Sequence, residues 1–341
     1  MKAAVLNHYD KNGTDLEIQD LPVPVPEDDE ILVHIMAAGV NPLDNMIIRG
    51  EVKLIVPYKV PLIMGNEFSG IVEKAGKKAT RFKAGDRVYG RMPLKKIGAF
   101  AEYVAVKESA LAHIPDNLSF EEAATVPLTA LTAMQAFEIM QVKPGESVFI
   151  SGGTGSLGAM AIPIARSLGL HVYTNGSAEN EERVRKLGAE KFIDYKKENY
   201  VDVLSEVDHV LDTLGDRTLP DEFKVLKKGG NLVSLRGLPN GSFAKRSRMP
   251  LMKKILFLAA GRKYDKMAAT KSQTYDFLFV HEDGSQLEKI TGFFDKDHPL
   301  ETSIDAVFSL DQVNDALAKV KRGGSRGKTI IKVHESRSTN G

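Results

Sequence analysis

The sequence contains no cysteine. Disulfide bonds, thiol nucleophiles, thiolate-bound iron–sulfur clusters and thiolate zinc sites are therefore excluded. Only histidine, aspartate and glutamate could hold a metal ion. The eight histidines are scattered, and no two lie four residues apart, as two ligands on one helix face would. We therefore expect no metal.

An excess of either charge is also lacking. The chain has 46 Lys and Arg against 45 Asp and Glu, a formal net charge of +1. This balance gives no overall field that would attract nucleic acid or anionic lipid. We expect a small-molecule substrate and neither nucleic acid nor a membrane as partner. A homodimer is compatible with the sequence.

Long apolar runs are missing as well. The N-terminus turns polar at Asn7, after too short an apolar run for a secretion signal. The most apolar later stretch, residues 249–260, is interrupted by Lys253 and Lys254. A helix that spans a bilayer needs roughly 20 apolar residues. We expect a cytoplasmic protein without a transmembrane segment.

The 341 residues suffice for two domains, at roughly 100–200 residues each. Up to about Ala123, short strand-like segments such as Lys2–Leu6 and Glu30–Ala37 alternate with Gly/Pro turns. After Pro299 the chain returns to strands, with one helix over residues 310–320. These regions predict a β-rich, partly barrel-like domain.

The pattern changes at Ser119, which has Glu122 three residues later, as in a capping box. One helix is predicted from there to Met140. Beyond it strands and helices alternate, which indicates a parallel sheet with covering helices. The predicted strands are 147–150, 171–174, 191–193, 207–212, 231–235 and 275–280, and the predicted helices are 157–168, 180–187, 219–226 and 286–294.

Residues 245–272 are rich in Lys and Arg, a composition that nucleic-acid-binding patches share. Leu251, Ile255, Leu258 and Ala259 keep a helical apolar period, however. We therefore interpret the segment as an amphipathic helix with a solvated basic face.

The sharpest motif lies between predicted strand 147–150 and predicted helix 157–168, and reads Ser151-Gly152-Gly153-Thr154-Gly155-Ser156-Leu157-Gly158. Gly153 and Gly155 permit a tight turn, and Gly158 lets the helix lie close to the strand. The amides of Ser156 and Leu157 can point at a ligand from the helix N-terminus. The motif predicts a dinucleotide pyrophosphate site; a glycine-rich loop in an unrelated parallel-sheet protein is the alternative.

The end of the second strand bears on which dinucleotide binds. NAD-binding proteins usually place Asp or Glu there, on the ribose 2′-hydroxyl, but this strand ends in Thr174-Asn175-Gly176-Ser177. Neutral Asn175 and Ser177 would not repel a 2′-phosphate, and Arg183 or Arg185 follows nearby. NADPH is favoured over NADH, although three glutamates crowd the same loop.

Several motifs extend along nearly the whole chain. They are Gly39-Val40-Asn41-Pro42-Leu43-Asp44, Pro61-Leu62-Ile63-Met64-Gly65-Asn66-Glu67-Phe68-Ser69-Gly70, Gly85-Asp86-Arg87-Val88, Pro127-Leu128-Thr129-Ala130-Leu131-Thr132-Ala133, the glycine turn, Leu187-Gly188-Ala189 and Arg326-Gly327-Lys328-Thr329-Ile330. Together they resemble the medium-chain dehydrogenase/reductase superfamily, in its zinc-free quinone/enone oxidoreductase branch. The resemblance implies an α/β fold, with a Rossmann-type parallel-sheet domain over 123–294 and a β-rich, partly barrel GroES-like domain over 1–122 and 295–341.

The resemblance also bears on zinc. Zinc-dependent alcohol dehydrogenase relatives bind the metal with Cys, His and Cys, which motif matching places at Asn41, Asn66 and about Leu128. Carboxamides are poor zinc ligands and leucine is none, so the Lewis acid that stabilises an alkoxide is missing. Alcohol oxidation by that route is not expected.

The resemblance implies instead NADPH-dependent hydride transfer to quinones or to the C=C bond of α,β-unsaturated carbonyls. The resulting enolate needs only a few hydrogen-bond donors and water. Asn41 and Tyr58 are the candidate catalytic residues, and Tyr103 is a further one; a turn-forming Asn-Pro and packed aromatics are the alternatives. Residues 277–287 are especially similar to enone and alkenal reductases.

Residue by residue, the resemblance places Tyr195 by the 2′-phosphate, Thr129 near the nicotinamide, and the backbone of Phe279 and Val280 at the carboxamide. A lysine that relatives often have near the phosphate is Asn180 here, which weakens the case for NADPH. The predicted cofactor-binding residues are Asn41, Thr129, Gly153, Gly155, Ser156, Leu157, Asn175, Ser177, Tyr195, Thr213, Phe279, Val280, Arg326 and Lys328.

Two other functions stay open. The same glycine turn would serve a dinucleotide-binding protein with little turnover, such as a redox sensor or a structural protein of the lens-crystallin kind. An enoyl-thioester reductase would need a basic groove for the phosphate of an acyl carrier, and residues 246–254 offer basic side chains for one.

Overall fold

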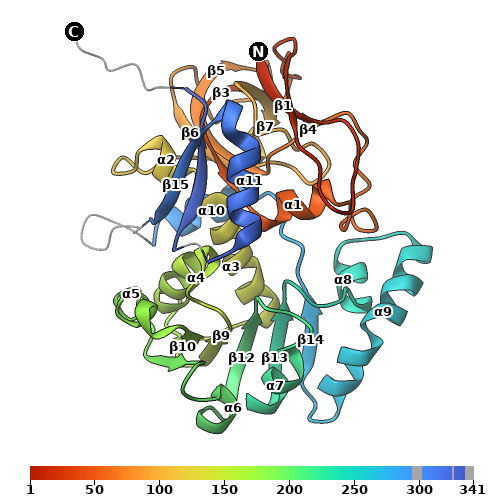
Figure 1. The fold of residues 1–341 in the computed structure, drawn as a ribbon, viewed down its shortest axis with the longest axis vertical. Helices are drawn as coiled ribbons and strands as arrows, with labels where there is room; N and C mark the ends of the chain where they lie inside the picture. Colours follow the sequence, from red (N-terminus) through yellow and green to blue (C-terminus); the bar gives the residue numbers. More distant parts are fainter. Residues whose placement is uncertain (294–301, 325, 335–341) are drawn as a thin grey trace. The chain divides into compact units, whose positions relative to one another are not determined.

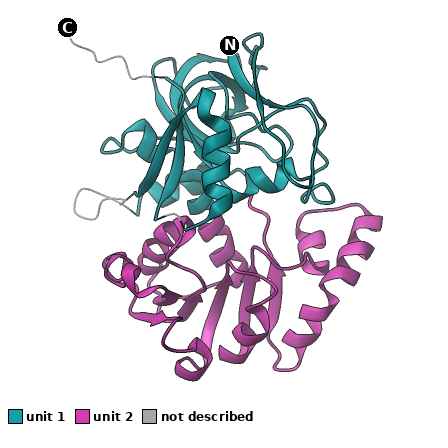
Figure 2. Cartoon of the chain, in the orientation of Figure 1, with its two compact units in different colours: residues 1–131, 281–341 teal, residues 132–280 magenta. Residues whose placement is uncertain are grey.

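The computed structural model describes residues 1–293, 302–324 and 326–334. The chain divides into two compact units (Figure 2): unit 1 comprises Met1–Leu131 and His281–Gly341, and unit 2 comprises Thr132–Val280. Residues 123–131 and 281–293, which the sequence analysis placed with the nucleotide-binding domain, thus lie in unit 1. Among the described residues, no helix combines the length and the apolar character needed to cross a bilayer.

Unit 1 is built around strand β3 (Glu30–Val40), which is buried along almost its whole length. A seven-stranded sheet has the order β15-β16-β3-β5-β6-β8, with β7 also paired to β3, and a smaller sheet has the order β2-β1-β4 (Figure 1). The other strands are β1 (Lys2–Leu6), β2 (Glu17–Asp20), β4 (Leu62–Ile63), β5 (Glu67–Ala75), β6 (Arg87–Arg91), β7 (Tyr103–Lys107), β8 (Leu111–His113), β15 (Ile304–Ser309) and β16 (Lys328–Lys332). The helices are α1 (Pro42–Ile48), η1 (Glu108–Ala110), α2 (Phe120–Ala123), α10 (Gly284–Thr291), η3 (Leu310–Gln312) and α11 (Val313–Arg322).

Strand register brings distant parts of the sequence to one point of this sheet. Gly39 of β3 faces both Glu67 of β5 and Ile330 of β16, and Glu67 in turn faces Arg91 of β6. Side chains from four strands therefore meet where β3 ends and α1 begins.

Unit 2 is a six-stranded, all-parallel sheet in the order β11-β10-β9-β12-β13-β14. Its strands are β9 (Ser147–Ile150), β10 (His171–Gly176), β11 (Lys191–Asp194), β12 (Val207–Asp212), β13 (Leu226–Ser234) and β14 (Thr274–Phe277). Its helices are α4 (Ser156–Ser167), η2 (Ala178–Asn180), α5 (Glu181–Lys186), α6 (Tyr200–Val203), α7 (Leu219–Val225), α8 (Gly241–Arg246) and α9 (Leu251–Ala269), while α3 (Pro127–Met140) contains the boundary between the units. Strand order reverses beside β9, which puts a ligand crevice at its carboxyl end. The predicted fold class is confirmed.

The single helix predicted from Ser119 to Met140 is wrong. Ser119 and Glu122 do form the capping box, with the Glu122 amide 3.2 Å from the Ser119 hydroxyl. Helix α2 nevertheless ends at Ala123, and α3 starts at Pro127. Proline has no N–H and disfavours a helical residue before it, so the chain breaks there and starts a new helix.

A helix was predicted over the basic segment from a period of apolar residues. The structure has that helix, α9, but these apolar residues do not form its buried face. Those residues, Leu251, Ile255, Leu258 and Ala259, are all exposed on α9. The side chains that pack on unit 2 come from the opposite side, at Phe257, Gly261, Tyr264 and Ala268. Periodicity identified the helix but not the side that it buries.

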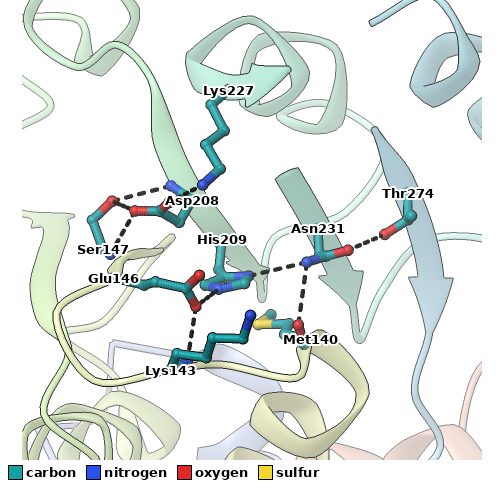
Figure 3. A network of polar contacts seen from close by, with 9 residues as sticks. All are labelled: Met140, Lys143, Glu146, Ser147, Asp208, His209, Lys227, Asn231 and Thr274. Atoms are coloured by element: carbon teal, nitrogen blue, oxygen red, sulfur yellow. Dashed lines mark hydrogen bonds and ion pairs between the residues drawn. The ribbon is translucent and has the colours of Figure 1, made fainter. Parts of the chain in front are cut away.

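A polar network ties together the first residues of the central strands of unit 2 (Figure 3). Asp208 accepts hydrogen bonds from the amide and hydroxyl of Ser147, at 2.8 and 2.7 Å, and from the Lys227 ammonium. Beside it, His209 Nε2 lies 2.8 Å from Glu146 Oε2. Burial by itself would raise the pKa of Asp208, but the hydrogen bonds from Lys227 and Ser147 outweigh it and lower the pKa to about 2.

We expect Asp208→Asn to remove a pH-dependent part of the stability. Because the folded pKa lies below the unfolded value, Asp208 stabilises fully above about pH 5, and this contribution disappears as the pH falls toward about 2. Its size is about 1 kcal/mol after discounting for solvent screening. Urea unfolding should show a loss for the variant at pH 7 that vanishes at low pH. Asp221→Asn, which breaks the exposed pair with Lys224, is the matched control; an equal loss in both would contradict the assignment.

Candidate functional site

The glycine turn of unit 2 joins β9 to α4, and local geometry explains most of its glycines. Gly152 has φ +67°, a conformation that favours glycine. A Cβ at Gly153 would lie 2.2 Å from Thr174 Oγ1, and one at Gly158 would lie 1.9 Å from the Gly153 carbonyl oxygen. Both clashes are too close for any side chain, so the turn and helix α4 can pack together only with glycine at these positions.

Gly155 differs from its neighbours. Its φ of −83° and ψ of −176° suit any residue, and a Cβ there would meet nothing nearer than the Gly152 carbonyl oxygen at 3.8 Å. The fold itself therefore does not require glycine here. Ser156 and Leu157 follow at the start of α4, a 12-residue helix whose N-cap provides no side-chain hydrogen bond. The free space lies where the first amides of the helix can bind an anion.

Two residues at the end of β10, Thr174 and the predicted cofactor-binding residue Asn175, hold the turn itself. Thr174 Oγ1 accepts from the Gly153 amide at 3.1 Å and donates to the Ile150 carbonyl at 2.7 Å. Asn175 Oδ1 accepts from the Gly152 amide at 2.7 Å. The neutral side chains of this strand end thus keep the glycine turn in shape.

Other predicted residues surround this strand end. The Tyr195 amide donates to the last residue of β10 at 3.2 Å, and its side chain is 59% exposed. The Ser177 hydroxyl accepts from Asn180 at 3.0 Å. Arg183 donates to the carbonyl of Thr154. Tyr195 is therefore placed beside the end of β10, and Arg183 at the glycine turn.

Thr213 follows β12, and Phe279 and Val280 follow β14. Because the sheet is parallel, these positions share the edge of the sheet on which the glycine turn lies. The Thr213 hydroxyl donates to the Ser151 carbonyl at 2.7 Å, so it also supports the turn.

Unit 1 contains a buried polar cluster, which we call the Asn41 cluster: Asn41, Asp44, Asn66, Glu67 and Lys328. The Lys328 ammonium lies 2.6 Å from both Asn41 Oδ1 and Glu67 Oε1, and Asn41 Nδ2 donates to the same Glu67 oxygen at 2.8 Å. Asp44 accepts from the Asn41 amide and from Asn66 Nδ2, each at 2.7 Å. Lys328 and Glu67 are at most 3% exposed, so the cluster holds a cation and a carboxylate away from water.

Backbone geometry makes this cluster possible. A Cβ at Gly39 would lie 2.4 Å from Glu67 Oε1, so glycine is needed for the carboxylate to reach its place. The other Glu67 oxygen accepts from the Leu128 amide at 2.7 Å, at the start of α3.

The Asp44 carboxyl is completely buried, and burial raises its pKa to about 7. The hydrogen bonds from Asn41 and Asn66 and the charge of Lys328 lower the pKa, whereas Glu67 raises it further. Asp44 therefore exchanges a proton near neutral pH, which changes the charge of the Asn41 cluster.

The sequence analysis missed Arg91, the last residue of β6. It is fully buried, donates to the Met92 carbonyl, and lies 3.9 Å from Glu282 through Nη1. Its Nε and Nη2 have no hydrogen-bond partner within the described part of the chain. The sequence offered one signal for this residue: a charged side chain at the end of an apolar strand, between Tyr89 and Met92.

Tyr58, a predicted catalytic residue, belongs to the same region as Arg91. Its hydroxyl is buried and finds no partner in the ranges that the structure describes. Burial raises the pKa of Tyr58 to about 12, and the positive charge of Arg91 opposes the shift. The phenol is thus a hydrogen-bond donor at neutral pH.

Three other predicted residues have different surroundings. The Thr129 hydroxyl donates back to its own helix, at the Thr125 carbonyl 3.0 Å away. Arg326 is exposed, and Ser303 donates to its carbonyl. Tyr103 stacks on His34, with ring centroids 4.7 Å apart, which is the packed-aromatic arrangement.

Comparison with known proteins identifies the family. Residues 27–116 match the alcohol dehydrogenase GroES-like domain, and residues 187–331 match the zinc-binding dehydrogenase family. A 2-methylene-furan-3-one reductase of Solanum lycopersicum is 31% identical over 324 residues, which cover 92% of this chain and 74% of that protein. A chloroplastic NADPH-dependent alkenal/one oxidoreductase of Arabidopsis thaliana is 34% identical over 274 residues, covering 75% and 68%.

A solved structure agrees with these relatives. The quinone oxidoreductase of Coxiella burnetii has a TM-score of 0.82 to this chain at 27% identity, covering 98% of this chain and 99% of that one. The chain therefore belongs to the medium-chain dehydrogenase/reductase superfamily of oxidoreductases, in its quinone/enone oxidoreductase branch.

Lys328→Met tests whether the Asn41 cluster is an obligatory ion pair. Removing the ammonium leaves Glu67 buried and uncompensated, and we expect a loss of about 3–5 kcal/mol in unfolding free energy. Adding Glu67→Gln should recover part of it, because no charge then remains unpaired. Urea unfolding of the double-mutant cycle measures the coupling. Lys332→Met, on the same strand but in a half-exposed pair with Glu121, should cost far less, and a similar loss would refute the pairing.

Proposed function

We propose that this protein uses NADPH to reduce quinones or the C=C bond of α,β-unsaturated carbonyl compounds, and that it does so without a metal ion. The observation that carries the proposal is the Lys328 ammonium, held by Asn41 and Glu67 in the interior of unit 1. It gives this oxidoreductase a built-in cation in contact with Asn41, one of the positions that match zinc ligands in alcohol-oxidising relatives.

The turn between β9 and α4 supports a dinucleotide as cofactor. Gly155 leaves room that its own backbone does not require, directly at the first amides of α4. Those amides would bind the pyrophosphate, because they have no acceptors within the helix and lie at the positive end of its dipole. When bound, the nicotinamide supplies the hydride.

The preference for NADPH rests on the end of β10. No acidic side chain occupies the position where NAD-binding proteins usually hold the ribose, because Asn175 is there and binds the glycine turn. The exposed Tyr195 hydroxyl is available to a 2′-phosphate beside this strand end. The Arabidopsis relative is NADPH-dependent by its name.

The side chains of the Asn41 cluster do not fit zinc. The Asn41 carbonyl oxygen already accepts from Lys328, and the Asn66 amide nitrogen donates to Asp44. A divalent cation would be repelled by the neighbouring ammonium. Elsewhere in the described ranges, no three His, Asp or Glu side chains gather in a way that could hold a metal.

Reduction places negative charge on the carbonyl oxygen of the substrate. Hydride addition at the β-carbon gives an enolate, and addition to a quinone gives a hydroquinone anion; each then takes up one proton. Buried donors in a water-poor site stabilise such an oxyanion strongly. Arg91 and the Tyr58 phenol provide donors without other partners in the described residues, and we assign them this role.

Initial rates with NADPH and NADH test the proposal, using a 1,4-quinone, a 2-alkenal and a cyclic enone as acceptors. We expect oxidation of NADPH by at least one acceptor class, slower oxidation of NADH, and no effect of EDTA. A simple alcohol should not reduce NADP⁺. Rates that fall with EDTA and return with zinc would contradict metal independence. Tight NADPH binding without turnover of any acceptor would favour the redox-sensor alternative.

Gly155→Val tests the dinucleotide site separately from the fold. Its backbone angles suit valine and no atom blocks the side chain, so the melting temperature should hardly change. NADPH affinity should fall more than about tenfold, because the branched side chain displaces phosphate from the amides. Fluorescence titration measures the affinity. Gly158→Val, which clashes at 1.9 Å, should destabilise the fold instead. Unchanged affinity in Gly155→Val would place the cofactor elsewhere.

A further inference from the structure

The first half of α9 exposes a continuous apolar surface, which we call the α9 surface. Its large members are Leu251, Met252, Ile255, Leu256 and Leu258, exposed by 72%, 78%, 55%, 45% and 59%. Single exposed apolar residues are ordinary, but five within two helical turns form a contiguous patch of the kind that marks an interaction site.

Helical geometry places this surface opposite the anchored face of α9. At about 100° per residue, positions 251, 255 and 258 lie together, with 252 and 256 beside them. The buried positions, from Phe257 to Ala268, lie about half a turn away. They fix the helix to unit 2: the Phe257 and Phe243 ring centroids are 5.9 Å apart, and those of Tyr264 and Tyr275 are 5.0 Å apart. The apolar side chains therefore project outward from a firmly held helix.

The surroundings of the α9 surface are strongly basic. Residues 241–270 contain eight Lys and Arg and one acidic residue, Asp265, although the whole chain is nearly neutral. Asp265 accepts a hydrogen bond from Asn240 at 2.8 Å. Arg246 is paired with Asp276 at 2.7 Å. Lys254, Arg262 and Lys263 are exposed, and the last two lie on the outward side of the helix, one turn beyond Leu258. The apolar patch is thus directly adjacent to positively charged side chains.

This combination favours an anionic apolar partner over a second copy of the chain. A two-fold symmetric contact brings a patch against itself, so it would set these lysines and arginines against their own counterparts, with Asp265 as the one acidic residue of the helix. A lipid surface offers both complements, with negative headgroups for the cations and acyl chains for the leucines.

We propose that α9 docks this protein onto the surface of membranes that contain anionic lipids. The apolar side chains enter the boundary between headgroups and acyl chains, and the flanking Lys and Arg remain at the phosphates. The expectation of no membrane partner rested on net charge and on the lack of a spanning run, and neither applies to a helix that lies in the interface. The docking does not depend on the proposed reaction.

The test is sedimentation of the full-length protein with lipid vesicles. We expect binding to vesicles of phosphatidylcholine with phosphatidylserine, little binding to phosphatidylcholine alone, and weaker binding at high salt. The triple variant M252Q/I255Q/L258Q should bind at least about tenfold less, because its apolar area no longer enters the lipid. Arg262→Glu should bind about fivefold less or worse, from the loss and reversal of one charge near an anionic surface.

Matched controls separate this surface from general effects. Val25→Gln with Leu54→Gln alters side chains that are 84% and 60% exposed in unit 1, and Lys77→Glu reverses an exposed charge of the same unit. These variants should bind vesicles like the wild type. The proposal is overturned if the wild type ignores anionic vesicles, or if the triple variant binds as well as the controls. It is also overturned if sedimentation equilibrium without lipid shows a dimer that the triple variant abolishes while vesicle binding is absent, since the occupant is then a second copy.

Discussion

The contact between the Lys328 ammonium and the Glu67 carboxylate, 2.6 Å apart in the interior of unit 1, constrains the structure around it. A buried charge without its partner costs several kcal/mol, so β16 and β5 can occupy only the register that brings the two together. Gly39 lies between them on β3 because a Cβ would strike Glu67, and α3 begins where its Leu128 amide reaches the same carboxylate. One ion pair thus specifies the junction of three strands and a helix.

In the proposed reaction, the same pair would let this fold support hydride chemistry without a metal. A reductase of conjugated carbonyls must stabilise charge on an oxygen, and fixed protein donors do this at no reorganisation cost. Lys328 and Arg91 place two cations about Glu67, one through β16 and the other directly opposite it on β6. Asp44 has a pKa of about 7. When it is ionised, it and Glu67 together balance the charges of Lys328 and Arg91. Unit 1 can bury two cations because buried carboxylates lie close enough to balance their charge.

The sequence was informative where function depends on backbone geometry or on a fixed run of residues. The glycine turn could be recognised because Gly152, Gly153 and Gly158 meet steric demands that no other residue satisfies. Lys328 and Asn41 were found through their motifs, but the contacts of Lys328 with Asn41 and Glu67 were not, because these residues meet only through strand register. Arg91 was missed for the same reason. The break before Pro127 was overlooked because a strong capping signal at Ser119 concealed it.

The α9 surface shows that the net charge of a chain does not describe the charge of a single surface. A net charge of +1 argues against an anionic partner only if opposite charges are mixed within a Debye length, about 8–10 Å at ordinary ionic strength. Over residues 241–270 they are segregated, since eight of the nine charged side chains there are basic. A partner approaching α9 therefore meets a local positive field, because Asp265 is the one acidic residue of this helix against five Lys and Arg. What this surface can bind depends on the local segregation of charge. The net charge of the whole chain does not show that segregation.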